Sequence, residues 1–449
     1  MFKTLKNAWK TPELQKKMLF TLFIVLLYRL GATICVPYVK SDVATGFSAA
    51  YGSSVLGLMS TLSGGAMQYA TLFALSVSPY ITASIVMQLL SIAIPPLERL
   101  AKSGPDGQKK INLITRIVTV ALSVITSLGY SLILKNGTNG VSWLERGDWF
   151  AMLVVNASFC AGAALVMWLA ELINEKGIGN GISIILFANI ISRIPSMAMA
   201  LWEEIVMNDA YHWAVGAAIA LVVLVAVVAI VGFVVWITNS ERRIPIQYAK
   251  RTVGRKMYGG QATKLPIKLN MSGVMPIIFA NSIVMIPATI VAFMPNADNW
   301  FTKFVDNFFD TDTWEYLVVF LLLIVAFSYF YIMISFNPVE VANNINQNGG
   351  TIPGQRPGRP TVQYINKILK RITLLGAFFL CIVAGLPMLV TVVVEAIRAT
   401  NTAASAAMPD LTALTFGGSS LLIVVGVALE TVRDIEAQLS LRANKGFLS

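Results

Sequence analysis

The sequence predicts an all-α polytopic membrane protein, and three observations support this fold class. Only 13% of the 449 residues are charged, where a soluble domain carries roughly 25%. Hydrophobic residues make up 56% of the chain and the mean hydropathy is +0.69, which fits a chain surrounded mostly by lipid. Ten apolar stretches are long enough, at about 20 residues each, to cross about 30 Å of hydrocarbon as helices.

The ten predicted spans are distributed along the whole chain. The basic start of the chain runs into the first span without a small-x-small cleavage site, so we expect that helix to stay in the membrane. The fifth span is the weakest, because Arg193 interrupts it. The spans are Met18–Val36, Thr71–Ile94, Leu113–Leu134, Trp149–Ala170, Gly181–Ala200, Trp213–Ile237, Met271–Met294, Tyr316–Phe336, Ile372–Val394 and Thr412–Leu429.

Lys and Arg alternate in abundance along the connections between spans. Five precede the first span, and residues 95–112 hold four, residues 238–270 eight, residues 337–371 five and the C-terminal segment three. The connections between these hold at most two each, and residues 295–315 are mainly acidic. Short cytoplasmic loops are enriched in positive charge, so we expect the basic segments and both termini to lie in the cytoplasm.

Residues 43–97 contain no charge and are long enough to cross twice. A double crossing would invert every later loop against the charge pattern, so only one full span fits. The remainder, roughly Ser53–Met67, is apolar, too short to cross, and ends in Gly64-Gly65. It predicts a half-inserted helix, which requires a cavity, because irregular backbone at membrane depth must be buried or line water. A helix on the outer surface is the alternative.

The spans lack the side chains that coupled transport and enzyme chemistry need. Ion-coupled carriers usually keep Asp, Glu or His in the membrane, whereas the carboxylates here sit at span ends. The single histidine, His212, cannot alone form a zinc site or a nucleophile relay. The three cysteines are far apart in apolar runs and suggest neither disulfides nor a metal site. We therefore expect no enzyme activity, metal or cofactor.

Two further features predict structure rather than chemistry. Arg29 lies within the first span, where a central arginine costs about 2.5 to 3.5 kcal/mol, so we expect it to face protein or to reach the membrane surface. The tract Gly177–Gly181 lacks the strand context and glycine spacing of a phosphate-binding loop. It predicts a tight turn that leads into the fifth span.

Two cytoplasmic loops are strongly basic. Residues 238–270 carry eight Lys and Arg against Glu241 alone, and the alternating run RRIPIQY predicts a short extended piece. Residues 337–371 add Arg356 and Arg359 beside three prolines, which would stiffen a projecting loop. Such cationic projections suit acidic or phosphate-rich partners. Orientation bias and anionic lipid headgroups are alternative explanations for the same charges.

Six ordered motifs resemble the SecY family of protein-conducting channels over almost the whole chain. The resemblance implies ten helices in two inverted halves, residues 1–202 and 203–449, around an hourglass pore. The motifs are SGGAMQYATLFALSVSPYITASIVMQLL (Ser63–Leu90), MWLAELINEKGIGNGISIILFANI (Met167–Ile190), RRIPIQYAKR (Arg242–Arg251), LPIKLNMSGVMPIIFA (Leu265–Ala280), FNPVEVANNI (Phe336–Ile345) and FGGSSLLIVV (Phe416–Val425).

The resemblance also implies four sets of functional residues. A ring of aliphatic side chains would close the waist of the pore: Val77, Ile81, Leu186, Ile278 and Ile423. A plug at about residues 53–66 would seal the outer funnel and includes Leu56, Leu58, Met59, Leu62, Ser63, Gly64 and Gly65. A lateral gate, where spans 2 and 3 face spans 7 and 8, would contain Thr82, Thr126, Asn281 and Ser282. Residues that dock a cytoplasmic driver would be Arg242, Arg243, Lys250, Arg251, Arg255, Lys256 and Arg356.

By this resemblance the chain is expected to pass unfolded secretory polypeptides across the cytoplasmic membrane of a bacterium and to release apolar segments sideways into the lipid. The expected partners are SecE-like and SecG-like small subunits, the SecA motor ATPase, the ribosome, signal peptides and anionic lipids. A secondary transporter or small-solute channel is the alternative, because such proteins also have ten spans and inverted repeats. A membrane enzyme is the third class.

Overall fold

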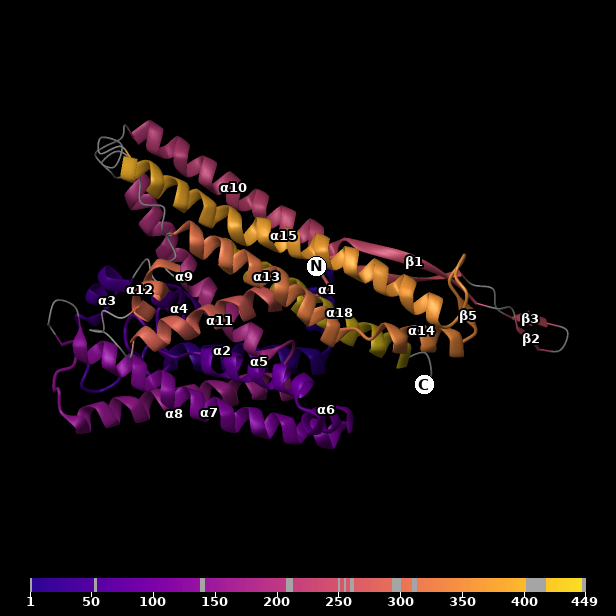
Figure 1. Cartoon of the computed structure of the whole chain (residues 1–449), viewed down its shortest axis with the longest axis horizontal. Coiled ribbons are helices and arrows are strands. Elements are labelled where there is room, and N and C mark those ends of the chain that lie inside the picture. Colours follow the sequence, from indigo (N-terminus) through magenta and orange to yellow (C-terminus); the bar gives the residue numbers. More distant parts are fainter. Residues whose placement is uncertain are drawn as a thin grey trace.

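The computed structural model describes residues 2–51, 55–137, 142–206, 213–248, 251–253, 256–258, 262–292, 300–308, 313–400 and 417–445. Long helices run side by side, and a narrow sheet projects from one end of the bundle (Figure 1). In this view α2, α5, α7 and α8 lie on one side of the bundle, and α10, α13 and α15 lie on the other. The predicted membrane fold is confirmed.

The N-terminal part of the chain contains nine helices in the described residues. Two of the short ones, α3 and α4, lie between the first and second predicted spans. The helices are α1 (Phe2–Lys10), α2 (Pro12–Gly31), α3 (Val43–Tyr51), α4 (Val55–Leu62), α5 (Ser78–Ala93), α6 (Pro95–Lys102), α7 (Pro105–Asn136), α8 (Trp149–Lys176) and α9 (Gly181–Val206).

The C-terminal part contains the remaining described helices and all of the described strands. Its helices are α10 (Trp213–Asn239), α11 (Met275–Ala292), α12 (Trp300–Phe308), α13 (Trp314–Ser335), α14 (Pro338–Gln347), α15 (Arg359–Thr400) and α18 (Gly417–Lys445). Its strands are β1 (Glu241–Tyr248), β2 (Arg251–Val253), β3 (Lys256–Tyr258), β4 (Ala262–Lys268) and β5 (Gly350–Thr351).

A helix lies in each of the ten predicted spans: α2, α5, α7, α8, α9, α10, α11, α13, α15 and α18. Among the described residues, six helical stretches are long and apolar enough to cross a membrane unaided, and α5 with α6 makes a seventh if that bent pair counts as one span. Apolar side chains of α10, such as Leu221, Leu224 and Val228, are exposed. A helix that is apolar on its outer face fits a lipid surround, and the chain is a multi-pass membrane protein.

The second span is shorter than predicted. It was expected to begin at Thr71, but α5 begins at Ser78. Ala70 and Ser76 have φ angles of 46° and 49°, which a right-handed helix excludes. Pro79, in the first turn of α5, is compatible with a helix start. At the other end the chain bends by 103° into α6.

The predicted half-inserted helix is α4. It lies inside the bundle, where it contacts α9 and α11. Leu56 and Met59 are buried. This burial against α9 and α11 agrees with the predicted half-inserted helix and not with the alternative of a helix on the outer surface.

The two basic loops form one folded unit instead of two independent projections. β1 pairs antiparallel with β4 from Glu241 to Gln247 and with β5 at Gln247–Tyr248, so the sheet order is β4-β1-β5. Ile244 and Ile246 of β1 share a buried cluster with Ile365 and Ile368 of α15. The expectation that residues 337–371 form a proline-stiffened loop is wrong for most of the segment. Asn337 caps α14 by accepting from the Val339 and Glu340 amides, and α15 begins at Arg359.

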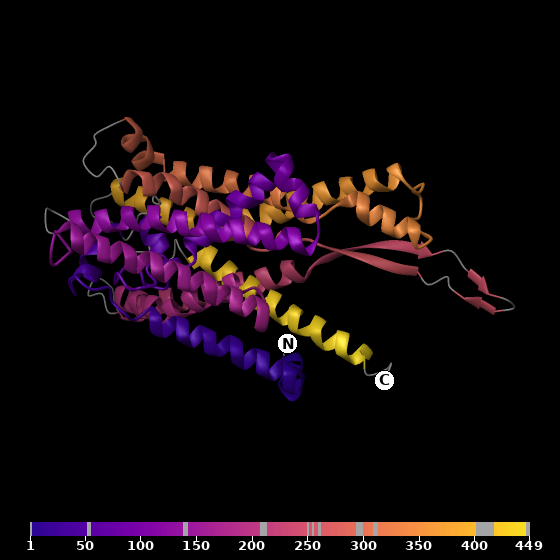
Figure 2. The same cartoon turned by 90° about the horizontal axis from the view of Figure 1, so that it is seen from below.

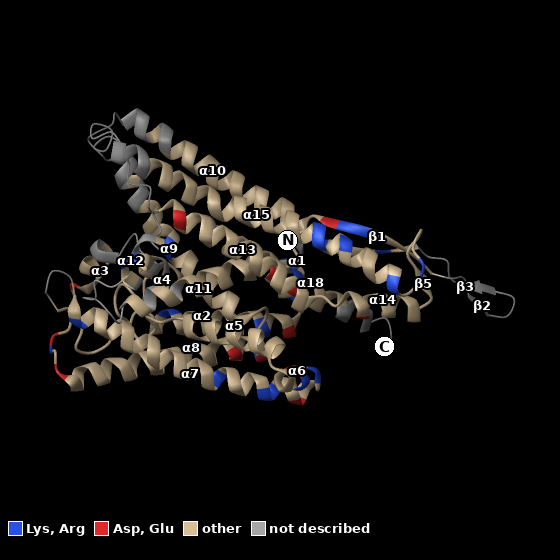
Figure 3. Ribbon diagram, in the orientation of Figure 1, with Lys and Arg blue, Asp and Glu red and all other residues tan. Residues whose placement is uncertain are grey.

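This basic unit, defined as β1–β5, α14 and the first turns of α15, stands at one end of the molecule (Figure 2). The first helix, α1, and the C-terminal end of α18 lie toward the same end. Lys and Arg are concentrated there, on β1, at the start of α15 and around α6 (Figure 3). The polarity of charge in the fold thus matches the alternation seen along the sequence.

Candidate functional site

Four helices bring aliphatic side chains together around a small cavity of about 20 Å³ at the centre of the bundle. The side chains are Ile81 of α5, Leu186 of α9, Ile278 of α11 and Ile423 of α18. All four are buried. Leu62, the last residue of α4, also lines the cavity. We call this place the constriction, because branched apolar side chains close it almost completely.

The fifth ring residue predicted from the resemblance, Val77, does not line this cavity. Val77 is buried and directly precedes α5, and the Ile81 amide donates to its carbonyl over 3.0 Å. The two residues are therefore one turn apart, as the sequence predicts. The shared helical face was not sufficient to place both side chains at the cavity.

Polar side chains also reach the constriction, from the predicted lateral gate. Asn281 and Ser282 of α11 line the cavity together with Ser78. The Ser282 hydroxyl donates to the Ile278 carbonyl over 2.9 Å. Asn281 is 3% exposed, and neither polar atom of its amide has a hydrogen-bond partner within the described part of the chain. The amide is therefore an unsatisfied group at the waist of the bundle.

The other two predicted gate residues are satisfied within their own helices. The Thr82 hydroxyl donates to the Ser78 carbonyl over 3.1 Å, and the Thr126 hydroxyl donates to the Leu122 carbonyl over 2.9 Å. Both side chains are half-buried. α11 packs against both α5 and α7, the helices that carry these threonines. The structure thus brings the gate helices together, and places two of the four gate side chains at the constriction.

The predicted plug corresponds to α4 and the turn that follows it. Ser63 stabilises this turn, because its hydroxyl donates to the Ser60 carbonyl over 3.0 Å and accepts from the Met67 amide over 3.1 Å. Gly64 and Gly65 have φ angles of 68° and 86°, which only glycine adopts readily. The side chain of Leu58 lies outside what the structure describes.

Arg29 and Arg193, two of the three arginines within the predicted spans, lie against the predicted plug. The Arg193 Nη1 donates to the Ser60 hydroxyl over 3.3 Å. Arg29 donates to the Ala188 carbonyl over 3.3 Å, and a Cβ built on Gly64 would stand 2.9 Å from its Nη1. From the sequence we predicted only that Arg29 faces protein or the membrane surface. Arg193 was noted only as a charge that interrupts the fifth span. A charged residue inside an apolar run was the available signal.

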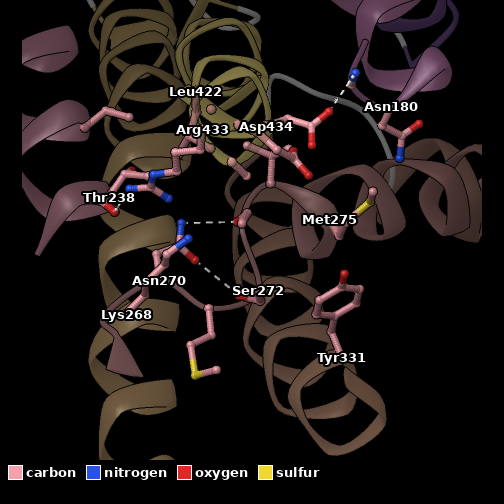
Figure 4. A pocket seen from close by; sticks show the side chains of 18 of the residues that line it. Asn180, Thr238, Lys268, Asn270, Ser272, Met275, Tyr331, Leu422, Arg433 and Asp434 are labelled. Atoms are coloured by element: carbon pink, nitrogen blue, oxygen red, sulfur yellow. Dashed lines mark hydrogen bonds between the residues drawn. The ribbon is translucent and has the colours of Figure 1, made fainter. Parts of the chain in front are cut away.

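A larger cavity of about 610 Å³, the vestibule, opens between α18, the end of β4 and the turn before α9 (Figure 4). Asp434 accepts from the Gly179 amide over 3.0 Å, and Arg433 donates to the Thr238 carbonyl over 2.8 Å. The predicted tight turn at Gly177–Gly181 is confirmed, with Gly179 at a φ of 75°. Burial and the nearby Arg433 lower the pKa of Lys268, which also lines the vestibule. Sequence reasoning missed this polar chamber.

The predicted docking residues that the structure describes belong to the basic unit or to the turn before α15. Arg242, Arg243 and Arg356 are exposed, and Arg243 forms an ion pair of 2.7 Å with Glu241. Arg251 and Lys256 are on the paired strands β2 and β3, and their side chains lie outside the described atoms. Lys250 and Arg255 fall outside the described residues. The unit therefore presents a basic surface built from both loops (Figure 3).

Known proteins resemble this chain over most of its length. A family model described as SecY matches residues 71–432, which is more than half of the chain. The chain belongs to the SecY family. It is 42% identical over 456 residues to the protein translocase subunit SecY of Streptomyces coelicolor, with 100% of each chain covered. It is 40% identical over 456 residues to the SecY subunit of Mycobacterium bovis, with 98% of each covered.

Solved structures share the SecY fold at low sequence identity. One is described as the structure of a protein conducting channel, with a TM-score of 0.63, 15% identity, and 94% of this chain and 92% of that chain covered. Another is Sec61 in the canine ribosome-channel complex from the endoplasmic reticulum, with a TM-score of 0.56, 13% identity and the same coverage. These likenesses establish the architecture.

Proposed function

We propose that this chain is the conduit of a protein translocase, which passes unfolded polypeptide through the constriction. The observation that carries the proposal is the meeting of Ile81, Leu186, Ile278 and Ile423, from four separate helices, at a cavity of about 20 Å³. α18 links the constriction to the vestibule, because Ile423 lines the first cavity and Leu422, Gly426 and Glu430 line the second. α4 covers the constriction through Leu62.

The chemistry of the constriction suits a passage for chains of any sequence. A narrow apolar waist disfavours water and ions, because a hydrophobic constriction tends to dewet. Branched aliphatic side chains can move aside around a peptide without selecting its residues, whereas a charged filter would select them. In the resting state α4 serves as a plug and closes the outer funnel, as its burial against α9 and α11 suggests.

Apolar segments would leave sideways between α5 and α7 on one side and α11 and α13 on the other. α11 packs on α5, α7 and α13, and a polar residue at this seam, Asn281, weakens it because its amide is unsatisfied. Helix association in lipid depends on packing and on polar contacts. An entering apolar signal segment would replace modest contacts with its own. The halves on either side of the seam are residues 1–202 and 203–449.

The energy for movement must come from another molecule, because the sequence has no nucleotide-binding loop and no coupling carboxylates in its spans. The basic unit, which we place in the cytoplasm, has Arg242, Arg243 and Arg356 exposed. Such a surface fits an acidic or phosphate-rich driver: the SecA motor ATPase or the ribosome. One structural relative was solved as a ribosome-channel complex, which supports this choice. SecE-like and SecG-like subunits and anionic lipids complete the assembly in the bacterial cytoplasmic membrane, with both termini in the cytoplasm.

Reconstitution tests the function directly. Proteoliposomes that contain the chain with its small subunits should protect a secretory polypeptide from external protease only when the motor and ATP are present. Arg356→Glu should lower the protected fraction at least several-fold while the protein inserts normally, since it reverses charge on an exposed turn. Uptake of small solutes without a motor, combined with no polypeptide protection, would contradict the proposal and favour the transporter alternative.

A further inference from the structure

A fully buried polar cluster joins the end of α4 to three other parts of the N-terminal half. The Asn189 Nδ2 on α9 lies 2.9 Å from the Leu62 carbonyl oxygen, 2.9 Å from the Tyr28 hydroxyl and 3.1 Å from the Ser76 hydroxyl. The hydroxyls of Tyr28 and Ser76 lie 3.2 Å apart. Asn189, Tyr28 and Ser76 are all buried. The cluster therefore connects α2, α4, the start of α5 and α9.

Leu62 is the member of this cluster that depends most on Asn189. Its carbonyl belongs to the last turn of α4, where carbonyl groups have no intrahelical partner, and a carbonyl can only accept. The amide of Asn189 must therefore turn its N–H group toward α4, which leaves its Oδ1 without a partner among the described residues. Asn189 serves as a side-chain cap for the C-terminal end of the plug.

The remaining members do not need Leu62. The hydroxyls of Tyr28 and Ser76 can each donate or accept, so they can satisfy each other and the Asn189 amide if α4 moves away. The Leu62 carbonyl would then be hydrated in the open funnel. The contact between Asn189 and Leu62 can thus break without leaving either group buried and unpaired. A reversible contact requires this.

Two arginines hold the same end of α4 from the sides. Arg193, one turn after Asn189 on α9, donates to the Ser60 hydroxyl. Arg29, next to Tyr28 on α2, donates to the Ala188 and Asn189 carbonyls, and its Nη1 lies 2.9 Å from where a Cβ on Gly64 would stand. These contacts fix the turn after α4 against the backbone of α9 beside Asn189.

The cluster adjoins the constriction on two sides. Ser76 directly precedes Val77 and α5. Asn189 follows Leu186 by three residues on α9, so the two side chains share a helix face. Leu62 itself lines the constriction. A polypeptide that separates α5 from α9 at the constriction therefore also separates the groups that hold Leu62.

From these contacts we infer that Asn189 is a positioning residue that latches the plug to the constriction, and that widening of the constriction releases it. This inference rests on the proposed function, in which α4 is the plug. With this latch in place, the plug would open only when the helices around the constriction move. Asn189 acts on the plug and not on the passing chain.

A cysteine reporter on the plug tests the latch. The native Cys35, Cys160 and Cys381 are replaced by serine, and Met59→Cys places a buried thiol on α4. A membrane-impermeant maleimide added from outside then labels the plug at a rate set by how often it leaves its site. Asn189→Leu, which removes the donor at similar volume, should raise this rate about three- to tenfold, the range for one lost hydrogen bond.

Three controls separate a latch from general loosening. Ser192→Ala removes a hydroxyl that donates to the Asn189 carbonyl but does not bond α4, and should leave the rate unchanged. Tyr28→Phe keeps the Leu62 contact and should raise the rate less than Asn189→Leu. A thiol at Val155→Cys, buried in α8, should stay unlabelled in the Asn189→Leu background.

Two results would overturn the latch. One is equal labelling of Met59→Cys with and without Asn189→Leu, and the other is a parallel rise at Val155→Cys, which would indicate loosening of the whole bundle. Deletion of residues 55–62 separates this failure from failure of the plug itself. If the deletion raises ion conductance in planar bilayers while Asn189→Leu changes nothing, the plug stands and the latch is wrong. If the deletion leaves conductance unchanged, both are wrong.

Discussion

At the residue scale, Asn281 and Asn189 show how the same side chain acts in opposite ways at the constriction. Asn189 satisfies a plug carbonyl, which stabilises the closed arrangement. Asn281 is buried with both amide atoms unpaired among the described residues. A buried unsatisfied polar group costs about 1 to 3 kcal/mol. Its burial therefore costs free energy where α11 packs against α5 and α7.

Replacement of Asn281 by leucine should stabilise the closed state, because leucine has a similar size and needs no partner. We expect Asn281→Leu to raise the midpoint of thermal unfolding in detergent, in keeping with a gain of about 1 to 3 kcal/mol. We also expect it to reduce translocation of substrates with weakly apolar signal segments. Ser282→Ala is the matched control, since the Ser282 hydroxyl is bonded to its own helix. A lower midpoint for Asn281→Leu would show that the amide has a stabilising partner.

Four of the five predicted ring residues meet at one cavity, and family motifs were the source of that prediction. Ile81, Leu186, Ile278 and Ile423 line one cavity, although 342 positions separate the first from the last in the chain. Periodicity can place a residue on a helix face, but it cannot tell which face meets three other helices. Asn189 was not predicted for the same reason. The sequence around a lone asparagine in an apolar run does not reveal whether the side chain bonds another helix or faces a groove.

At the element scale, the segment between α4 and α5 is held by close backbone approach. Gly162 of α8 is the clearest case, because a Cβ built there would lie 1.9 Å from the Leu72 carbonyl oxygen. Backbone cannot move aside as a flexible side chain can. Span prediction missed this segment because residues 71–77 are as apolar as a helix, while their conformation depends on packing against α8.

Gly162→Ala should therefore displace α8 from Leu72 and destabilise the protein by about 1 to 3 kcal/mol, the range for overpacking. Gly232→Ala on α10 is the control, because nothing lies within 4 Å of the added methyl and alanine favours helix more than glycine. Thermal unfolding of both variants in detergent distinguishes them. Equal midpoints would mean that α8 can shift freely against this segment.

The basic unit shows that the content of charged residues alone does not predict strands and helices. The sequence predicted one short extended piece and one stiff loop, but the structure has a three-stranded sheet, a two-stranded sheet and two helices. Ile244 and Ile246 alternate as in a half-buried strand, and Ile365, Ile368 and Ile372 repeat as on a helix face. The prediction rested on the many Lys and Arg residues and did not use these two repeats of isoleucine. The isoleucines of both repeats together form the core of the unit.

At the scale of the whole molecule, α18 connects the basic surface, the vestibule and the constriction. Arg433 bonds the end of α10 at Thr238 and Asn239, and Asp434 bonds the turn before α9 at Gly179. Ile423 lies about three turns away along the same helix and lines the constriction. Through these bonds α18 is joined both to the end of α10 and to the turn before α9.

The most direct test is to locate an arrested secretory chain inside the protein. Photo-crosslinking residues placed at Ile81 and Ile278, which line the constriction, should both crosslink to the arrested chain. The same probe at Leu224, which is 64% exposed on the outer face of α10, should not. Crosslinks that appear at Leu224 and are absent at Ile81 and Ile278 would mean that the polypeptide takes a route outside the constriction, and would contradict the account.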